Sequence, residues 1–429
     1  MQKPTVDSLY ASASEKFRLI AMSMAGNFLE FYDFALYGIL VPIMSPLFFP
    51  SKEAWFSEIM GLVVFTMGFI ARPLGAAMFG MIGDRYGRKQ SLRWSVVLMA
   101  VATMGIGILP TYEMIGIAAP ALLIVLRILQ GISAGGESNG SVIFVMEHFP
   151  PNQRGLGSSL MSSATISGVI LATFVSSLLT ADEGHHQHWR WAFIAGSAIG
   201  IVSYYIRKHL NESPQFLQIV RANNISKNPL KETFRKAPMA VLQTFCLSAV
   251  AGALQLSLAG YFSIYLKDHL NMPFSQIIFL NAICLLIYAF ILPITGLLVD
   301  RVNPLKLLLG SSLAAVVCLI PIYQLAAVGT VAAIIAAQLW LAVITALYVG
   351  PKSVVMYNLF ETKIRFTGVS FGYASGVSVF GGLTPIINKS LDHVGFSPAL
   401  FAVACGVITS VTILFLWRNP PKNIPHEGF

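Results

Sequence analysis

Residues 80–89 read GMIGDRYGRK, a short stretch that holds three glycines and four charged residues. It separates two apolar runs, 56–82 and 91–110. A helix that crosses a lipid bilayer needs about 20 mostly apolar residues, and each run reaches that length. The stretch is therefore predicted to be a tight polar loop between two transmembrane helices.

The same alternation of long apolar runs and short polar loops continues along all 429 residues. Hydrophobic residues make up 55% of the chain and charged residues 11%, against about 45–50% and about 25% in soluble proteins. The mean hydropathy is +0.71. This composition argues against a soluble enzyme, a nucleic-acid-binding module and a disordered scaffold. We predict twelve spans, at 18–47, 56–82, 91–110, 119–147, 156–180, 191–208, 237–266, 274–299, 304–325, 331–359, 367–390 and 397–417.

The basic residues predict the orientation of these spans. If the N-terminus is cytoplasmic, 21 of the 28 lysines and arginines fall on the cytoplasmic side and four on the other. This bias follows the positive-inside rule and places both termini in the cytoplasm. The net charge of +9 is thus a signal of topology and does not indicate nucleic acid.

The chain also repeats itself at half its length. FPPNQRGLG at 149–157 matches FETKIRFTG at 360–368 with an offset of 211, and GDRYGRK at 83–89 is echoed by VDRVNPLK at 299–306. Parallel repeats around a central site are a recurrent design of transporters. We predict an all-α integral membrane protein with two pseudosymmetric six-helix bundles. The bundles span residues 1–208 and 237–429, and the cytoplasmic linker loop spans 209–236.

Several motifs resemble those of a known family. The loop at 80–89 and RILQGISAGGE at 127–137 resemble two motifs of the major facilitator superfamily. Within it, GNFLEFYDFALYG at 26–38, RPLG at 72–75 and the segment 350–368 are similar to the metabolite:proton symporter family. That family includes importers of proline/betaine, 2-oxoglutarate, citrate and shikimate. The resemblance covers the whole chain and implies the twelve-helix fold and transport by alternating access.

The first span carries acidic residues that suit proton coupling. Asn27, Glu30, Asp33 and Tyr37 fall within a 120° arc of one helix. Charged residues inside a membrane are costly and usually functional. Two carboxylates one turn apart repel each other, so one of them can take up and release a proton near neutral pH.

The fourth span offers a partner for these acids. Arg127, Gln130 and Glu137 share one face, and the resemblance to proton-coupled sugar porters implies that Asp33 pairs with Arg127. Protonation of Asp33 would then free Arg127. Glu30 is the competing proton carrier. The predicted coupling set is Asp33, Glu30, Arg127 and Glu137.

Substrate binding is predicted at polar and aromatic residues of both halves. Lys352 could bind a substrate carboxylate, but it could also snorkel to the cytoplasm or pair with Glu137. Aromatic rings could receive a quaternary ammonium group, although most aromatic residues in spans serve packing. The predicted set is Asn27, Tyr37, Gln130, Tyr261, Tyr288, Gln338, Tyr348 and Lys352.

A cytoplasmic gate is implied by the resemblance. Asp84 can meet the positive N-terminus of span 11, and Arg88 can pair with Glu147. Asp300, Arg301 and Arg365 form a reduced copy in the second half, where Asn358 replaces the acid that matches Glu147. The predicted gating set is Asp84, Arg85, Arg88, Glu147, Arg154, Asp300, Arg301 and Arg365.

No cofactor or metal is expected. The loop 182–188 has three histidines, but no regular element fixes their spacing, so a solvated loop is the better interpretation. The chain has no GxxxxGK[ST] loop, which argues against a drive by ATP. The four cysteines are each expected to be packing residues of an apolar span.

These observations predict a proton-coupled symporter, not an enzyme, in the inner (cytoplasmic) membrane. It would import a small polar metabolite, a carboxylate or a zwitterion such as proline or betaine, by alternating access. Its partners would be the solute, protons and the lipid bilayer, without nucleic acid, and it would work as a monomer. One alternative is a proton-coupled antiporter that exports a drug or metabolite. Another is a receptor or scaffold that binds without transport.

Overall fold

The computed structural model describes residues 13–180, 189–270 and 272–419, and within these ranges its regular elements are all helical. The first bundle is made of α1 (Ala13–Phe48), α2 (Ala54–Tyr86), α3 (Arg88–Ile108), α4 (Tyr112–Ile115), α5 (Ala118–His148), η2 (Pro151–Gln153), α6 (Arg154–Thr180) and α7 (Trp189–Lys208). Two short helices follow, α8 (Pro214–Arg221) and α9 (Pro229–Lys236). The second bundle is made of α10 (Pro238–Leu256), η3 (Ser257–Tyr261), α11 (Phe262–His269), α12 (Phe274–Val299), α13 (Pro304–Ala327), α14 (Val331–Asn358), α15 (Arg365–Gly376), η4 (Val377–Gly381), α16 (Gly382–His393) and α17 (Leu400–Arg418).

Each predicted span corresponds to one helix or to one run of helices, and α4, α8 and α9 lie outside the predicted spans. Ten segments of the described chain are long and apolar enough to cross a membrane. The other two predicted spans are α7, which packs against α3 and α1, and the run α15–η4–α16, which packs against α2 and α10. A π-helical turn interrupts the predicted spans 7 and 11, at η3 and η4. The predicted twelve-helix fold in two bundles is confirmed.

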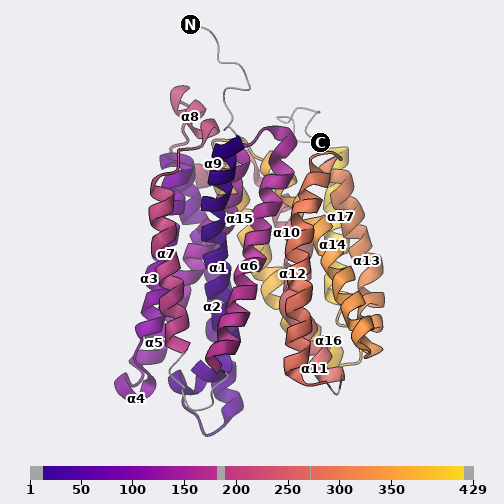
Figure 1. Ribbon diagram of the computed structural model, residues 1–429. Helices are drawn as coiled ribbons and strands as arrows, with labels where there is room; N and C mark the ends of the chain where they lie inside the picture. Colours follow the sequence, from indigo (N-terminus) through magenta and orange to yellow (C-terminus); the bar gives the residue numbers. More distant parts are fainter. Residues whose placement is uncertain (1–12, 181–188, 271, 420–429) are drawn as a thin grey trace.

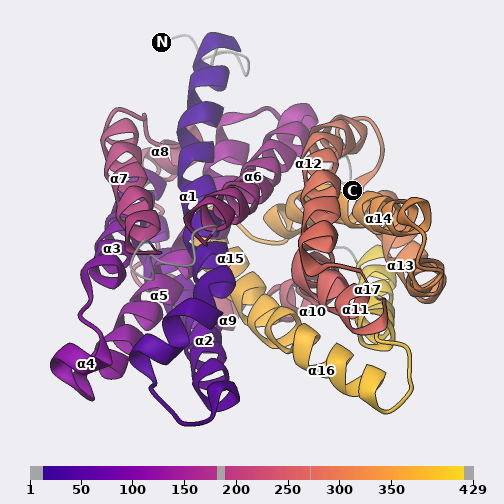
Figure 2. The same cartoon turned by 60° about the horizontal axis from the view of Figure 1, so that its bottom comes forward.

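The two bundles meet along a narrow set of helices. Figure 1 shows α1–α7 on one side and α10–α17 on the other, with α8 and α9 at the end where α1 begins and α17 ends. We call this end the terminal face. Figure 2 brings the opposite end forward and shows the same separation, with α6 beside α12 and α15 reaching toward α2.

Local sequence explains the helices that connect the bundles. Proline opens both α8 and α9, where its missing N–H costs nothing because the first N–H groups of a helix have no partner within it. Ser213 and Asn228 cap them by accepting hydrogen bonds from the N–H groups of Phe216 and Lys231. The predicted linker 209–236 therefore contains two capped helices.

Small residues let the helices of the first bundle approach closely. A Cβ atom added to Gly131 would collide with the carbonyl oxygen of Gly68, and one added to Gly135 would collide with that of Arg72. These two glycines therefore allow α5 to pack closely against α2.

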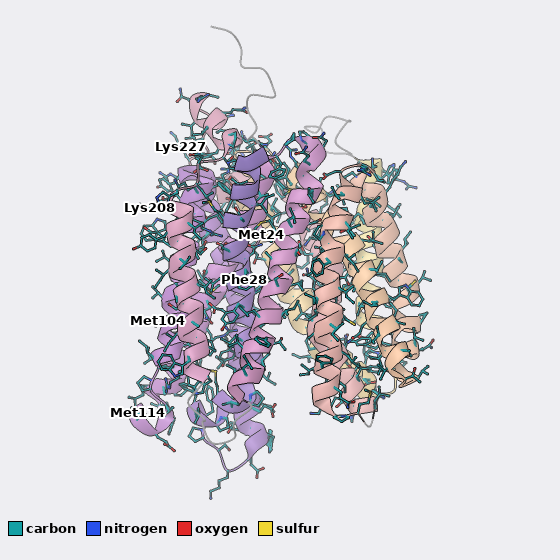
Figure 3. All side chains as sticks on the ribbon, in the orientation of Figure 1. Met24, Phe28, Met104, Met114, Lys208 and Lys227 are labelled. Atoms are coloured by element: carbon teal, nitrogen blue, oxygen red, sulfur yellow. The ribbon has the colours of Figure 1, made fainter. Side chains whose placement is uncertain are left out.

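The outer surface suits a lipid environment. Large apolar side chains such as Leu74, Phe290 and Val317 are exposed, and side chains of this kind cover both bundles. Figure 3 shows Lys208 and Lys227 toward the terminal face and Met114 near the opposite end. A belt of apolar side chains between polar ends is what a bilayer requires.

Candidate functional site

The terminal face is closed by two carboxylates that cap helices of the opposite bundle. Asp84, at the end of α2, accepts hydrogen bonds from the N–H groups of Phe366 (3.2 Å) and Thr367 (2.8 Å) at the start of α15. Asp300, after α12, accepts from Gly155 (2.6 Å) and Leu156 (2.9 Å) at the start of α6. An anion at a helix N-terminus is stabilised by the helix dipole and its free N–H groups. The predicted contact of Asp84 with span 11 is confirmed.

A buried ion network strengthens the first of these contacts. The Nε atom of Arg88 lies 3.1 Å from Oε2 of Glu147, and its Nη2 lies 3.2 Å from Asp84. The same Nη2 donates to the carbonyl oxygen of Thr362 at 2.6 Å. Arg365 approaches Glu147 at 3.5 Å. The predicted Arg88–Glu147 pair is confirmed, and the network joins the two bundles.

Three other predicted gating residues lie differently. Arg85 is exposed and stacks on Tyr86, at 5.1 Å from the ring centre, because it lies a quarter turn away from the inward-facing Asp84. Arg301 is also exposed. Neither forms an ion pair within the described residues, so their predicted gating role stays a prediction. Arg154 stacks on Tyr357 at 4.8 Å.

The linker reaches into this network, which the sequence did not indicate. Ser213 donates a hydrogen bond to Glu147, and Gln215 accepts from Arg365 at 2.8 Å. Glu212 accepts from the N–H groups of Arg88 and Lys89. Burial raises the pKa of Glu212, and the N–H donors around it oppose that rise.

The predicted Asp33–Arg127 pair is replaced by a relay. Thr103 of α3 donates a hydrogen bond to Asp33 and accepts one from Gln130 at 2.9 Å. Arg127 in turn donates to Gln130 at 2.7 Å, and its guanidinium lies 4.2 Å from the ring centre of Tyr37. Within the described residues Asp33 and Arg127 form no direct ion pair. The prediction of direct contact is wrong because the side chain of Thr103 lies between them.

Glu30 and Glu137 have different surroundings. Glu30 accepts a hydrogen bond from Ser138 and lies 3.8 Å from Arg72. Glu137 forms a buried ion pair with Arg207 of α7 and accepts from Ser95 at 2.8 Å. The considered pairing of Glu137 with Lys352 is therefore wrong, since both of its oxygens have other partners.

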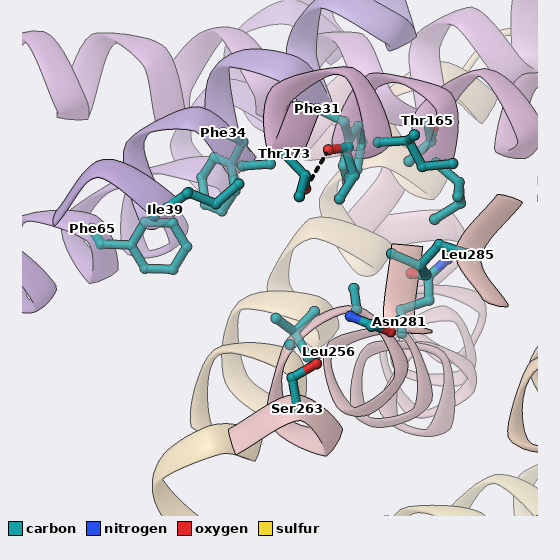
Figure 4. A pocket seen from close by; sticks show the side chains of 18 of the residues that line it. Phe31, Phe34, Ile39, Phe65, Thr165, Thr173, Leu256, Ser263, Asn281 and Leu285 are labelled. Atoms are coloured by element: carbon teal, nitrogen blue, oxygen red, sulfur yellow. Dashed lines mark hydrogen bonds between the residues drawn. The ribbon is translucent and has the colours of Figure 1, made fainter. Parts of the chain in front are cut away.

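A cavity of about 340 Å³ lies between the bundles, on the side away from the terminal face. Figure 4 shows its wall, with Phe31, Phe34 and Phe65 on one side and Asn281 and Leu285 on the other. A volume of this size suits a small ligand. Its polar or charged lining residues are Arg72, Thr165, Thr173, Gln255, Ser263, Asn281 and Tyr373.

A smaller recess of about 40 Å³ adjoins this cavity. Phe31, Thr165, Gln255 and Tyr373 line both spaces. The recess is also lined by Asn27, Ser138, Asn139, Val142, Ser162, Lys352 and Ser353. Most of these side chains can donate hydrogen bonds, so the recess is the polar end of an otherwise apolar chamber.

Two predicted substrate residues lie at these spaces. Asn27 lines the recess and accepts from Ser141 at 2.5 Å, and Lys352 lies 4.2 Å from the ring centre of Tyr373. The other six are described residues, and they do not line the cavity or the recess: Tyr37, Gln130, Tyr261, Tyr288, Gln338 and Tyr348. All six are buried. Tyr348, for example, donates to the carbonyl oxygen of Leu247 at 2.5 Å.

Sequence reasoning missed several residues of the site. Arg72 lines the cavity, and its charge inside an apolar span was the available signal. Arg207 lies at a span end and was counted with the cytoplasmic positive charges. Thr103 offered no signal, because a single threonine in an apolar helix is ordinary.

No cluster of metal-binding side chains occurs within the described ranges. The three histidines of loop 182–188 lie outside the described residues.

Comparisons with known proteins agree with this geometry. The model of the Major Facilitator Superfamily matches residues 24–384. The ectoine/proline transporter of Corynebacterium glutamicum is 29% identical over 98% of this chain and 88% of its own length. The proline/betaine transporter of Escherichia coli K12 is 31% identical over 95% of this chain and 85% of its own. Among solved structures, the proton:xylose symporter XylE superposes with a TM-score of 0.79 at 17% identity, over 96% of this chain and 97% of XylE. The likeness to XylE shows a shared fold.

Proposed function

The chain belongs to the major facilitator superfamily, and from that premise we propose that it imports a small carboxylate-bearing solute together with protons. It is a multi-pass membrane transporter and not an enzyme. Relatives at 29–31% identity carry proline, betaine or ectoine in their names, and these are small compounds with a carboxylate group. The alternating-access movement would rock residues 1–208 against 237–429, with 209–236 as the connection.

The observation that carries the proposal is a buried carboxylate beside the cavity. Glu30 is 1% exposed, and its bonding partner Ser138 lines the recess. One oxygen each of Glu30 and Asp33 accepts no hydrogen bond within the described part of the chain. A buried carboxylate whose negative charge lacks some of its hydrogen-bond donors binds a proton more readily than a carboxylate that is exposed to water. This arrangement supports a role in proton coupling for both residues.

The closed terminal face supports access of the solute from the opposite side. Its buried network separates the cavity from that side of the membrane, so this conformation receives solute from the opposite side. The positive-inside bias of the sequence supports a cytoplasmic terminal face. Solute would thus enter from outside and leave into the cytoplasm, with the protein acting as a monomer in the inner membrane.

The test is internal pH in proteoliposomes that contain a trapped dye. Proline, betaine, amino acids, dicarboxylates and tricarboxylates are added one at a time. We expect acidification with at least one solute, and its loss in Glu30→Gln or Asp33→Asn. Glu113→Gln, at an exposed residue of α4, is the matched control.

Three outcomes would contradict the proposal or part of it. If no solute moves protons inward while a drug or metabolite is exported, the antiporter is supported. If solutes bind without any flux, the receptor or scaffold is supported. If both carboxylate variants keep proton-driven accumulation, the coupling role of Glu30 and Asp33 is wrong.

A further inference from the structure

The aromatic side chains of the cavity already face cations of the protein itself. Arg72 lies 4.5 Å from the ring centre of Phe34, 4.8 Å from Phe69 and 5.9 Å from Phe31. Arg127 lies 5.5 Å from Phe65. Cations within about 6 Å of a ring centre are attracted to its face. The contacts that would hold a quaternary ammonium group are therefore made internally.

The fifth ring of the cavity, that of Tyr373, faces Lys352 in the same way, at 4.2 Å. Lys352 belongs to α14 and is 4% exposed. Its ammonium group forms no hydrogen bond or ion pair with any described residue. A buried charge without a partner is costly, so an anion that enters the recess would be stabilised strongly.

The surroundings of Lys352 can complete a carboxylate site. Asn27, Asn139 and Gln255 line the same recess, and their amide groups can donate to carboxylate oxygens. The adjoining chamber is largely apolar, with four phenylalanines in its wall. The two spaces together would hold a molecule with a carboxylate at one end and a compact apolar body.

The charges around the two spaces favour an anion over a zwitterion. Two cations, Arg72 and Lys352, line them, and one carboxylate, Glu30, lies beside Arg72 at 3.8 Å. The carboxylate of Glu30 is already paired with Arg72. A second positive centre on the substrate would thus meet Arg72 without an available acid.

We propose that the substrate is a small organic anion whose carboxylate binds Lys352, and that the cavity discriminates against quaternary ammonium zwitterions. The proposal rests on the transport function proposed above and narrows its substrate class. The proposed substrate differs from betaine, which the name of a relative contains. Lys352 is then the residue that determines specificity.

Equilibrium binding to the purified full chain tests this directly. The probes are acetate, benzoate, succinate, 2-oxoglutarate and citrate, compared with proline and glycine betaine, and the readout is protection against thermal unfolding. We expect at least one anion to bind ten times more tightly than glycine betaine. Lys352→Met should weaken that binding at least tenfold, Lys352→Arg should restore most of it, and Lys52→Met, at an exposed lysine, should change nothing.

The outcomes separate this proposal from the transport function. Glycine betaine or proline binding as tightly as every anion would overturn it, and so would no binding by any anion. Unchanged anion binding in Lys352→Met, in a variant that unfolds at the wild-type temperature, would also overturn it. Proton-driven uptake of betaine would support the proposed symport function and contradict the proposed anion substrate. Anion binding that depends on Lys352, without proton-driven uptake, would support the anion site and contradict the proposed symport function.

Discussion

The two copies of the gate at the terminal face share one device and differ in another. In both copies an aspartate accepts hydrogen bonds from the N-terminus of a helix in the opposite bundle. Asp84 caps α15 and Asp300 caps α6. Among the described residues, only the first copy surrounds its carboxylate with buried ions, namely Arg88 and Glu147. In the second copy Asn358 stands in the position of Glu147, and Arg301 is exposed.

The repeat therefore preserves the aspartate that caps a helix, but it does not preserve the buried ion network. Backbone N–H groups at a helix N-terminus are present whatever the side chains are, so a single aspartate is enough to use them. A buried ion network needs several matched side chains, and removal of one of them leaves an uncompensated buried charge that destabilises the protein. We infer that closure of the terminal face depends mainly on the first copy.

The largest expected effect follows from removing Glu147. Glu147→Gln leaves Arg88 buried without its main partner, and such a loss typically costs about 3–5 kcal/mol. We expect the terminal face to open more often and the protein to unfold at a lower temperature. The readout is alkylation of Ser353→Cys from the terminal side, with the four native cysteines replaced by serine.

Glu361→Gln is the control for this change. Glu361 lies on the same face, and its side chain is 42% exposed where it meets Lys363. Exposed ion pairs contribute about 0–1 kcal/mol, so alkylation should stay at the wild-type rate. Equal alkylation in both variants would show that the buried network does not hold the gate closed.

The next largest effect is a difference in uptake between variants of the two capping carboxylates, Asp84 and Asp300. Asp84→Asn and Asp300→Asn each weaken hydrogen bonds to two N–H groups, at about 1.5–3 kcal/mol for a bond to a charged group. Asp84→Asn also removes a partner of Arg88. We therefore expect Asp84→Asn to slow uptake more than tenfold and Asp300→Asn to slow it several-fold. Equal losses would mean that the network adds nothing to the cap.

The sequence predicted much of this face but little of the cavity. The cap on α15 and the Arg88–Glu147 pair were expected because the motif at 80–89 resembles a family motif, although both contacts join residues far apart in the sequence. The relay through Thr103 could not be predicted, because it depends on how α3 packs beside α1 and α5. The same holds for Arg207, whose burial against Glu137 comes from the packing of α7. Six of the eight predicted substrate residues are buried but do not line the cavity or the recess, because the packing of the helices decides which residues face these spaces.

A smaller effect tests whether the second copy can be restored. Asn358 lines a space at the terminal face together with Arg154 and Arg365. Asn358→Asp would place a carboxylate near these guanidinium groups and should stabilise the closed state by about 1 kcal/mol. We expect slower alkylation of Ser353→Cys, and partial recovery in the Asp300→Asn background. Faster alkylation would show that the asparagine is needed for its own contacts.

The smallest effect is expected at the two exposed arginines of the copies. Arg85 and Arg301 correspond to each other in the repeat, and both side chains point to solvent in the closed state. Surface substitutions away from special features usually change stability by less than about 0.5 kcal/mol. Arg85→Gln and Arg301→Gln should therefore keep near wild-type uptake and alkylation in proteoliposomes. If either variant slows uptake without changing alkylation of the closed state, that arginine acts when the face is open. The asymmetry between the copies would then apply to one conformation only.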